Sequence, residues 1–275
     1  MRLALTIQTP EVPVPVPVAL LSGTLEEKLQ KAARMGANGV EFITTEPASL
    51  DVPALRDQLN QHDLLAAAVA SGGMAFAAKL TLLNPDPSNA ALARKRLNEL
   101  IALAAALGSQ VVTIGSFRGR SVENKERSLH QLAGILHQAG DFAAGYGVEI
   151  ALEPLNRFEG DLLNNVEQGL AFLKELNHPA VGLLVDTFHV NIEEASWTEP
   201  FRQAMAAQKL FHIHLGDNNR LPPGKGLIDF DAILRTLRTI GYTGWLSAEL
   251  LGKPDPDTAG RQTIDHMTHL MKAIA

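Results

Sequence analysis

Residues 149–186 read EIALEPLNRFEGDLLNNVEQGLAFLKELNHPAVGLLVD, and this stretch decides the fold. Residues 149–153 and 181–186 are short apolar runs, which predict buried β-strands. Residues 165–176, between these runs, predict a helix. A helix that joins two strands in this way forms a right-handed βαβ unit, so the two strands are expected to be parallel neighbours.

The same unit repeats along the whole chain, which predicts eight strands and eight helices in strict alternation. The expected strands cover residues 3–8, 39–44, 64–70, 111–114, 149–153, 181–186, 210–215 and 245–250. The expected helices cover residues 24–35, 52–61, 90–107, 122–146, 165–176, 199–206, 230–240 and 259–274. In the first helix, Thr24 and Glu27 have the spacing of a capping box.

Eight such units in 275 residues predict a (β/α)8 TIM barrel that forms a single domain over residues 1–275. A doubly wound α/β sheet is the alternative, but it usually has fewer strands and often carries a glycine-rich phosphate turn. The chain contains no G-x-G-x-x-G or Walker pattern, and no shift in composition marks a domain boundary.

Composition excludes several classes of protein. Apolar residues make up 46% of the chain, which is enough for a large buried core. A net charge of −6 and a pI near 5.8 argue against nucleic acid as a partner. The absence of cysteine excludes disulfide scaffolds, zinc–thiolate sites and cysteine nucleophiles. No signal peptide or membrane span is recognisable, so we expect a cytoplasmic protein with no membrane partner.

Polar residues gather at the ends of the later strands, which is where TIM barrels carry their active sites. Side chains alternate inward and outward along a strand. The apolar residues mark the outward face, which packs against the helices, so the residues between them face into the barrel. By this parity four successive strands each end with an inward carboxylate or imidazole: Glu153, Asp186, His214 and Glu249. His212 also faces inward, and we interpret it as a hydrogen-bonded core residue.

This quartet predicts a metal site. Three carboxylates in an apolar barrel repel one another and resist ionisation, and a divalent cation removes that cost. Three oxygen donors and one nitrogen donor suit Mn²⁺, Mg²⁺ or Co²⁺, and also accommodate Zn²⁺.

Three segments resemble a known family. Residues 153–159 (EPLNRFE), 186–194 (DTFHVNIEE) and 212–220 (HIHLGDNNR), followed by residues 223–226 (PGKG), are similar to motifs of the ketose 3-epimerases. These enzymes are the D-tagatose and D-psicose (allulose) 3-epimerase group of the sugar phosphate isomerase/epimerase superfamily of xylose isomerase-like TIM barrels. The resemblance is strong over residues 149–249, and in the first 120 residues only the barrel pattern and residues 36–41 (GANGVE) are familiar.

The resemblance implies one divalent ion, Mn²⁺ first and Co²⁺, Mg²⁺ or Zn²⁺ as alternatives. It implies that Glu153, Asp186, His214 and Glu249 bind this ion and that Glu153 and Glu249 are also the acid/base pair. It further implies that substrate hydroxyls are bound by Glu159, His189 and Arg220. Members of this group are often dimers or tetramers, so a homo-oligomer is expected.

The expected reaction is metal-dependent epimerisation of a ketose or ketose phosphate at C3 through a cis-enediolate. A metal on the carbonyl and hydroxyl oxygens stabilises this intermediate, and inversion needs a base on one face and an acid on the other. An aldose–ketose or hydroxypyruvate-type isomerase on the same metal site is the alternative. Two further alternatives are a non-catalytic sugar-binding barrel and an AP-endonuclease-like protein, which needs more histidines at the strand ends and a basic DNA face.

Two loops and one strand end bear on the substrate. Residues 12–18 (VPVPVPV) predict a stiff first βα loop, or a lid or subunit contact over the barrel mouth. In residues 115–120 (GSFRGR), Arg118 and Arg120 either bind an anion such as a sugar phosphate or are exposed loop arginines. Residues 8–10 (QTP) lack the aromatic side chains that line the sugar site in typical family members.

Overall fold

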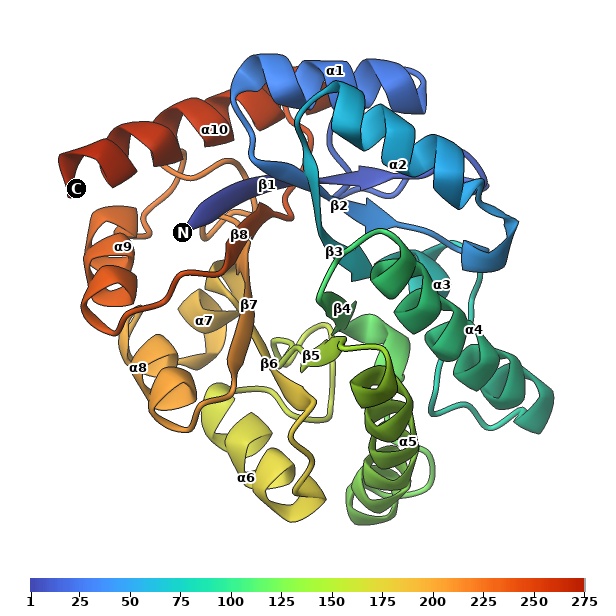
Figure 1. Ribbon diagram of the computed structural model, residues 1–275. Helices are drawn as coiled ribbons and strands as arrows, with labels where there is room; N and C mark the ends of the chain where they lie inside the picture. Colours follow the sequence, from blue (N-terminus) through green and yellow to red (C-terminus); the bar gives the residue numbers. More distant parts are fainter. Residues whose placement is uncertain (275) are drawn as a thin grey trace.

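The computed structural model describes residues 1–274 and contains a closed barrel of eight parallel strands inside a ring of helices (Figure 1). Each strand pairs with the next along the chain, and the last pairs with the first. The strands are β1 (Arg2–Gln8), β2 (Gly39–Ile43), β3 (Leu65–Ala70), β4 (Val111–Ile114), β5 (Glu149–Leu152), β6 (Val181–Asp186), β7 (Leu210–Leu215) and β8 (Trp245–Ala248). The predicted TIM barrel is therefore confirmed.

Eight helices lie where helices were predicted: α1 (Leu25–Met35), α2 (Val52–Gln61), α4 (Pro87–Ala106), α5 (Lys125–Gly145), α6 (Val166–Leu176), α8 (Glu199–Ala206), α9 (Phe230–Thr239) and α10 (Pro256–Ala273). Two short helices, α3 (Gly72–Phe76) and α7 (Thr187–Glu193), and two 3₁₀ turns, η1 (Pro47–Ser49) and η2 (Ser116–Arg118), were not predicted. The expected strict alternation is wrong at these points because such short helices show no helical period in the sequence. Within residues 1–274, no helix is long and apolar enough to cross a membrane.

Side-chain caps explain where several helices begin. In α1 the predicted capping box is present, because the Thr24 hydroxyl accepts from the Glu27 N–H while the Glu27 carboxylate accepts from the Thr24 N–H. The α4 and α10 helices each start three residues earlier than predicted. In both, an aspartate cap precedes a proline, Asp86 before Pro87 and Asp255 before Pro256. Proline is tolerated in a first turn because its missing N–H has no helical partner there.

The barrel has an inner core and an outer core, as strand parity predicts. Ala68, Val111, Ala151 and Leu184 form one buried cluster, whereas Ile150 and Leu152 belong to the larger core shared with the helices. Neighbouring strands β6 and β7 place Asp186 directly opposite His214, after a register shift between Leu183 and Leu184. This register brings two of the predicted metal ligands together at one end of the barrel.

Candidate metal centre

The four predicted metal ligands converge at the carboxyl ends of four neighbouring strands. Asp186 is the last residue of β6 and His214 lies near the end of β7, whereas Glu153 and Glu249 directly follow β5 and β8. One ligand atom from each of the four lies within 4.8 Å of the others. Four ligand atoms this close together could hold one metal ion.

Burial and unsatisfied atoms make this cluster suited to a cation. Glu153, Asp186 and His214 are only 5%, 1% and 1% exposed. Among residues 1–274, no hydrogen-bond partner is present for Glu153 Oε1, Asp186 Oδ2 or His214 Nδ1, although all three atoms are buried. Leaving such atoms unpaired costs free energy, and a divalent ion with oxygen and nitrogen ligands would satisfy them together. The residues present therefore fit a metal ion.

The electrostatics of the cluster also favour positive charge at its centre. Burial would lower the pKa of His214, but Glu41 and Glu249 outweigh it and hold this pKa well above the ordinary value. Burial and the neighbouring Glu153 raise the pKa of Asp186, against the effect of its positive neighbours. Burial would likewise raise the pKa of Glu249, but His214 and Arg220 lower it to about 2. Negative charge on the buried Asp186 is therefore unfavourable unless a cation lies beside it, whereas Glu249 is ionised at neutral pH.

The three residues expected to bind substrate surround the quartet. His189, on α7, has its Nε2 atom 3.4 Å from Glu153 Oε1 and 3.9 Å from Asp186 Oδ2. Arg220 Nη2 lies 2.5 Å from Glu249 Oε2, and Arg220 Nη1 lies 3.6 Å from Glu159 Oε1. The structure therefore brings every predicted site residue into one constellation.

Asn156 was not predicted, yet it connects two of these residues. Its side-chain amide lies 2.8 Å from His189 Nδ1 and donates to Glu159 Oε1 over 3.0 Å. Its backbone N–H also donates to His189 Nδ1. Because Nδ1 accepts, the neutral ring carries its proton on Nε2, which is directed at Glu153. Asn156 lies within the EPLNRFE motif and fell outside the strand-end pattern because it lies in a loop.

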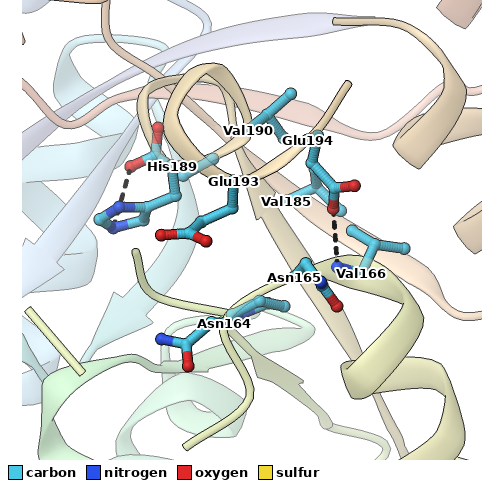
Figure 2. Close-up of a pocket in the computed structure, with 10 residues that line it drawn as sticks. Asn164, Asn165, Val166, Val185, His189, Val190, Glu193 and Glu194 are labelled. Atoms are coloured by element: carbon cyan, nitrogen blue, oxygen red, sulfur yellow. Dashed lines mark hydrogen bonds and ion pairs between the residues drawn. The ribbon is translucent and has the colours of Figure 1, made fainter. Parts of the chain in front are cut away.

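The loop that carries Asn156 and Glu159 is fastened to α7. Figure 2 shows the small pocket behind His189, where α7 faces the start of α6 and Glu194 accepts from the Val166 N–H. Next to it, Glu193 binds Arg157 through the backbone N–H and the guanidinium. These contacts hold the loop against the helix that carries His189.

A cavity of about 280 Å³ opens above the cluster. Its polar side contains Glu153, His214 and Glu249, together with His189, Arg220 and Glu159. Its apolar side contains Phe76 of α3, Leu155, and residues 16–18 of the loop after β1. This loop contains residues 12–18 (VPVPVPV) and is called the proline-rich loop below. The proline-rich loop thus lies over the barrel mouth, where it supplies part of the apolar wall of the cavity.

Neither expectation for Arg118 is correct. Arg118 is 1% exposed and donates to the backbone carbonyls of Glu153 and Leu162, each over 2.6 Å. Burial lowers its pKa to about 10, which leaves the guanidinium charged at neutral pH. Arg120 is exposed, as one reading expected, but it donates to the carbonyl of Glu159. Neither guanidinium lines the cavity above the cluster, so the two arginines do not form an anion site there.

Glu41 is a buried residue of the centre that sequence reasoning missed. It lies on β2, and its carboxylate bridges His212 Nε2 at 2.8 Å and His214 Nε2 at 3.0 Å. The interpretation of His212 as a hydrogen-bonded core residue is confirmed. Burial alone would raise the pKa of Glu41, but the two histidines lower it well below the ordinary value. The available signal was a single charged residue inside an otherwise apolar strand.

Comparisons of the sequence and of the fold with known proteins point to the same family. A family model described as xylose isomerase-like TIM barrel matches residues 29–270. A ketose 3-epimerase of Arthrobacter globiformis is 32% identical over 219 residues, which cover 78% of this chain and 74% of that protein. An L-ribulose 3-epimerase of Methylomonas sp. is 33% identical over 225 residues, which cover 79% of this chain and 75% of that protein. A solved L-ribulose 3-epimerase structure superposes with a TM-score of 0.82 at 27% identity, covering 98% and 95% of the two chains.

Proposed function

The chain belongs to the xylose isomerase-like TIM barrel family, and we propose that it is a divalent-metal-dependent epimerase that inverts C3 of a ketose. It is an enzyme of the isomerase class, as its curated relatives are. The single observation that carries the proposal is the convergence of Glu153, Asp186, His214 and Glu249 at the floor of a cavity.

These four residues would hold the metal, and we propose Mn²⁺ before Co²⁺, Mg²⁺ or Zn²⁺. A donor set of three carboxylates and one imidazole without any thiolate accommodates all four ions, and Mn²⁺ comes first because the resemblance to the ketose 3-epimerases implies it. When bound, such an ion would supply positive charge beside the two sugar oxygens on which negative charge develops.

Glu153 and Glu249 are the proposed acid/base pair. They follow strands β5 and β8, so they approach the cavity from different sides of the barrel. The ionised carboxylate of one residue takes the C3 proton to give a cis-enediolate, and the other residue, which starts as the protonated carboxylic acid, gives its proton to the opposite face of the same carbon. His189 and Arg220 carry N–H groups next to these carboxylates, where they would bind the sugar oxygens.

We propose a free ketose as substrate in preference to a ketose phosphate. A phosphate needs an available cationic side chain, and in the described part of the chain Arg220 is the one arginine or lysine that lines the cavity. Arg220 is already paired with Glu249, and Arg118 and Arg120 bind backbone carbonyls. The apolar wall from the proline-rich loop is also better suited to an uncharged ketose than to a charged phosphate group.

Further parts of the proposal concern partners and location. We propose that the protein does not bind nucleic acid, because its net charge is −6. The candidate centre, as far as the structure describes it, contains one histidine where an AP-endonuclease-like trinuclear site needs several. A homo-oligomer in the cytoplasm also belongs to the proposal.

The test is proton NMR of ketoses and ketose phosphates in D₂O, with metal-stripped protein before and after addition of Mn²⁺. We expect Mn²⁺-dependent incorporation of deuterium at C3 of a free ketose, together with appearance of its C3 epimer. Exchange at C1 with appearance of an aldose would replace the proposal with the aldose–ketose isomerase. Absence of Mn²⁺ binding would refute the metal centre itself.

A further inference from the structure

Glu41 lies beneath the candidate metal centre and belongs to none of the roles assigned above. It is the third residue of β2 and is 0% exposed. Its carboxylate touches no solvent, so its interactions are those with the surrounding side chains. A buried carboxylate is rare unless paired, so this position calls for a specific explanation.

The carboxylate of Glu41 contacts two imidazoles and a hydroxyl. Oε2 lies 2.8 Å from His212 Nε2, and Oε1 lies 3.0 Å from His214 Nε2. The Thr113 hydroxyl donates more weakly to Oε1 over 3.4 Å. An ionised carboxylate only accepts hydrogen bonds, so each imidazole must present a proton on Nε2.

This requirement determines the state of the other ring nitrogen of His214. With a proton on Nε2, the neutral ring has its lone pair on Nδ1. His214 Nδ1 lies 3.6 Å from Glu249 Oε2 and 3.9 Å from Glu153 Oε1. The lone pair is therefore directed among the carboxylates, whereas the opposite tautomer would place an N–H there and could not bind a cation.

We propose that Glu41 is a positioning residue that holds His214 in the metal-binding tautomer and orientation. The inference rests on the proposed metal-dependent function. His212 contributes by binding the second oxygen of Glu41, which fixes the plane of the carboxylate. Carboxylates behind a ligating histidine orient the ring and raise its basicity, and their loss typically weakens metal binding about 10–100-fold.

The first experiment measures Mn²⁺ affinity by titration calorimetry for the wild-type protein and the Glu41→Gln variant. Glutamine has nearly the same shape, but it has one acceptor oxygen for two imidazole donors. We expect the dissociation constant for Mn²⁺ to rise about 10–100-fold. Glu149→Gln is the matched control, because Glu149 begins β5 at the opposite end of the barrel, and its Mn²⁺ affinity should equal that of the wild type.

The outcomes separate this inference from the proposed function. Tight Mn²⁺ binding by both the wild type and Glu41→Gln would overturn the role of Glu41 and leave the metal centre intact. No Mn²⁺ binding by the wild type would overturn the centre and the role of Glu41 together. Weakened binding in Glu41→Gln, with Glu149→Gln unchanged, would support the inference.

A second measurement needs no variant and covers the case in which Glu41→Gln fails to fold. In wild-type protein loaded with ¹¹³Cd²⁺ and labelled with ¹⁵N-histidine, coupling between cadmium and nitrogen identifies the nitrogen that binds the ion. We expect one coupled histidine, with Nδ1 bound to the ion and a proton on Nε2. Coupling to Nε2 would overturn the inference whatever the behaviour of the variant.

Discussion

Glu153 illustrates how one side chain obtains its role from its place on a strand. It follows β5, where Ile150 and Leu152 pack against the helices, and alternation turns Glu153 into the barrel. Its carbonyl is held by Arg118 over 2.6 Å, while its Oε1 atom lies 3.4 Å from His189 Nε2. A backbone held by Arg118 and a carboxylate that faces the cavity suit the proposed role of moving a proton at a defined position.

Glu153→Gln is expected to lower kcat for C3 epimerisation about 10²–10⁴-fold, since an amide cannot exchange the substrate proton. Activity is measured at saturating Mn²⁺ with the metal content of each sample determined, because the variant also loses a charged ligand. Glu149→Gln, on the same strand, is the control and should keep wild-type turnover. Fully metal-loaded Glu153→Gln that turns over within about threefold of the wild type would refute the acid/base role.

Strand parity was enough to find the four proposed ligands because each lies at a strand end with an apolar neighbour that fixes its direction. Glu41 escaped the same logic, because it lies inside β2 and its partners His212 and His214 are about 170 residues away in the sequence. Asn156 escaped because no periodicity fixes the direction of a loop side chain. Contacts of this kind depend on how the barrel closes, which local sequence does not encode.

At the scale of elements, Arg118 joins three parts of the site. It lies at the end of η2 after β4, and it donates to carbonyls in the preceding turn, at Glu153 after β5, and at Leu162 in the loop that carries Glu159. A planar guanidinium with several N–H donors can satisfy all of these at once. The short η2 turn is thus a structural junction between β4, β5 and the loop that carries Glu159.

Arg118→Met is expected to lower the free energy of unfolding by about 2–4 kcal/mol, because it leaves buried carbonyls without a donor. Urea denaturation measures this change. Arg120→Met, in the same loop but exposed, is the matched variant and should cost about 0.5 kcal/mol or less. Equal stability of the two variants would contradict the structural role of Arg118.

The sequence predicted Arg118 poorly because arginines next to glycines are usually exposed in loops. Its environment is created by the loop between β5 and α6, which folds back over η2, and the deciding contact with Leu162 spans 44 residues. In contrast, α1 and α6 were predicted almost to the residue, since their caps and apolar faces are local. Local chemistry therefore sets the elements, and loop-to-loop contacts complete the site.

At the scale of the whole molecule, the barrel depends on joining the two ends of the chain. Strand β1 pairs with β8, and outside them α1 lies beside α10, as Figure 1 shows in blue and red. Between these helices Lys31 Nζ lies 2.6 Å from Asp257 Oδ2. Asp257 also accepts from the backbone N–H and the hydroxyl of Ser22. Asp257 thus links the last helix to the first helix and to the loop before it.

Asp257→Asn should destabilise the protein in a pH-dependent way. Partial burial would raise the pKa of Asp257, but Lys31 and Ser22 outweigh it and lower this pKa below its ordinary value. A carboxyl group with a lowered folded-state pKa contributes stability above the unfolded-state pKa of about 4, and this contribution is lost as the pH falls through the folded-state pKa. Because both side chains are about one-third exposed, we expect the loss at pH 7 to be about 0.5–1 kcal/mol.

The measurement is urea denaturation of the wild type and Asp257→Asn at pH 7, 5 and 3.5. The difference in unfolding free energy should persist from pH 7 to pH 5 and shrink at pH 3.5, since the wild-type carboxyl group then begins to take up its proton. Asp231→Asn is the control, because among residues 1–274 the side chain of Asp231 pairs with Arg235 of the same helix, α9, and not with a distant element. A difference that grows as the pH falls would contradict the proposed contribution of the Asp257 carboxylate to closing the barrel.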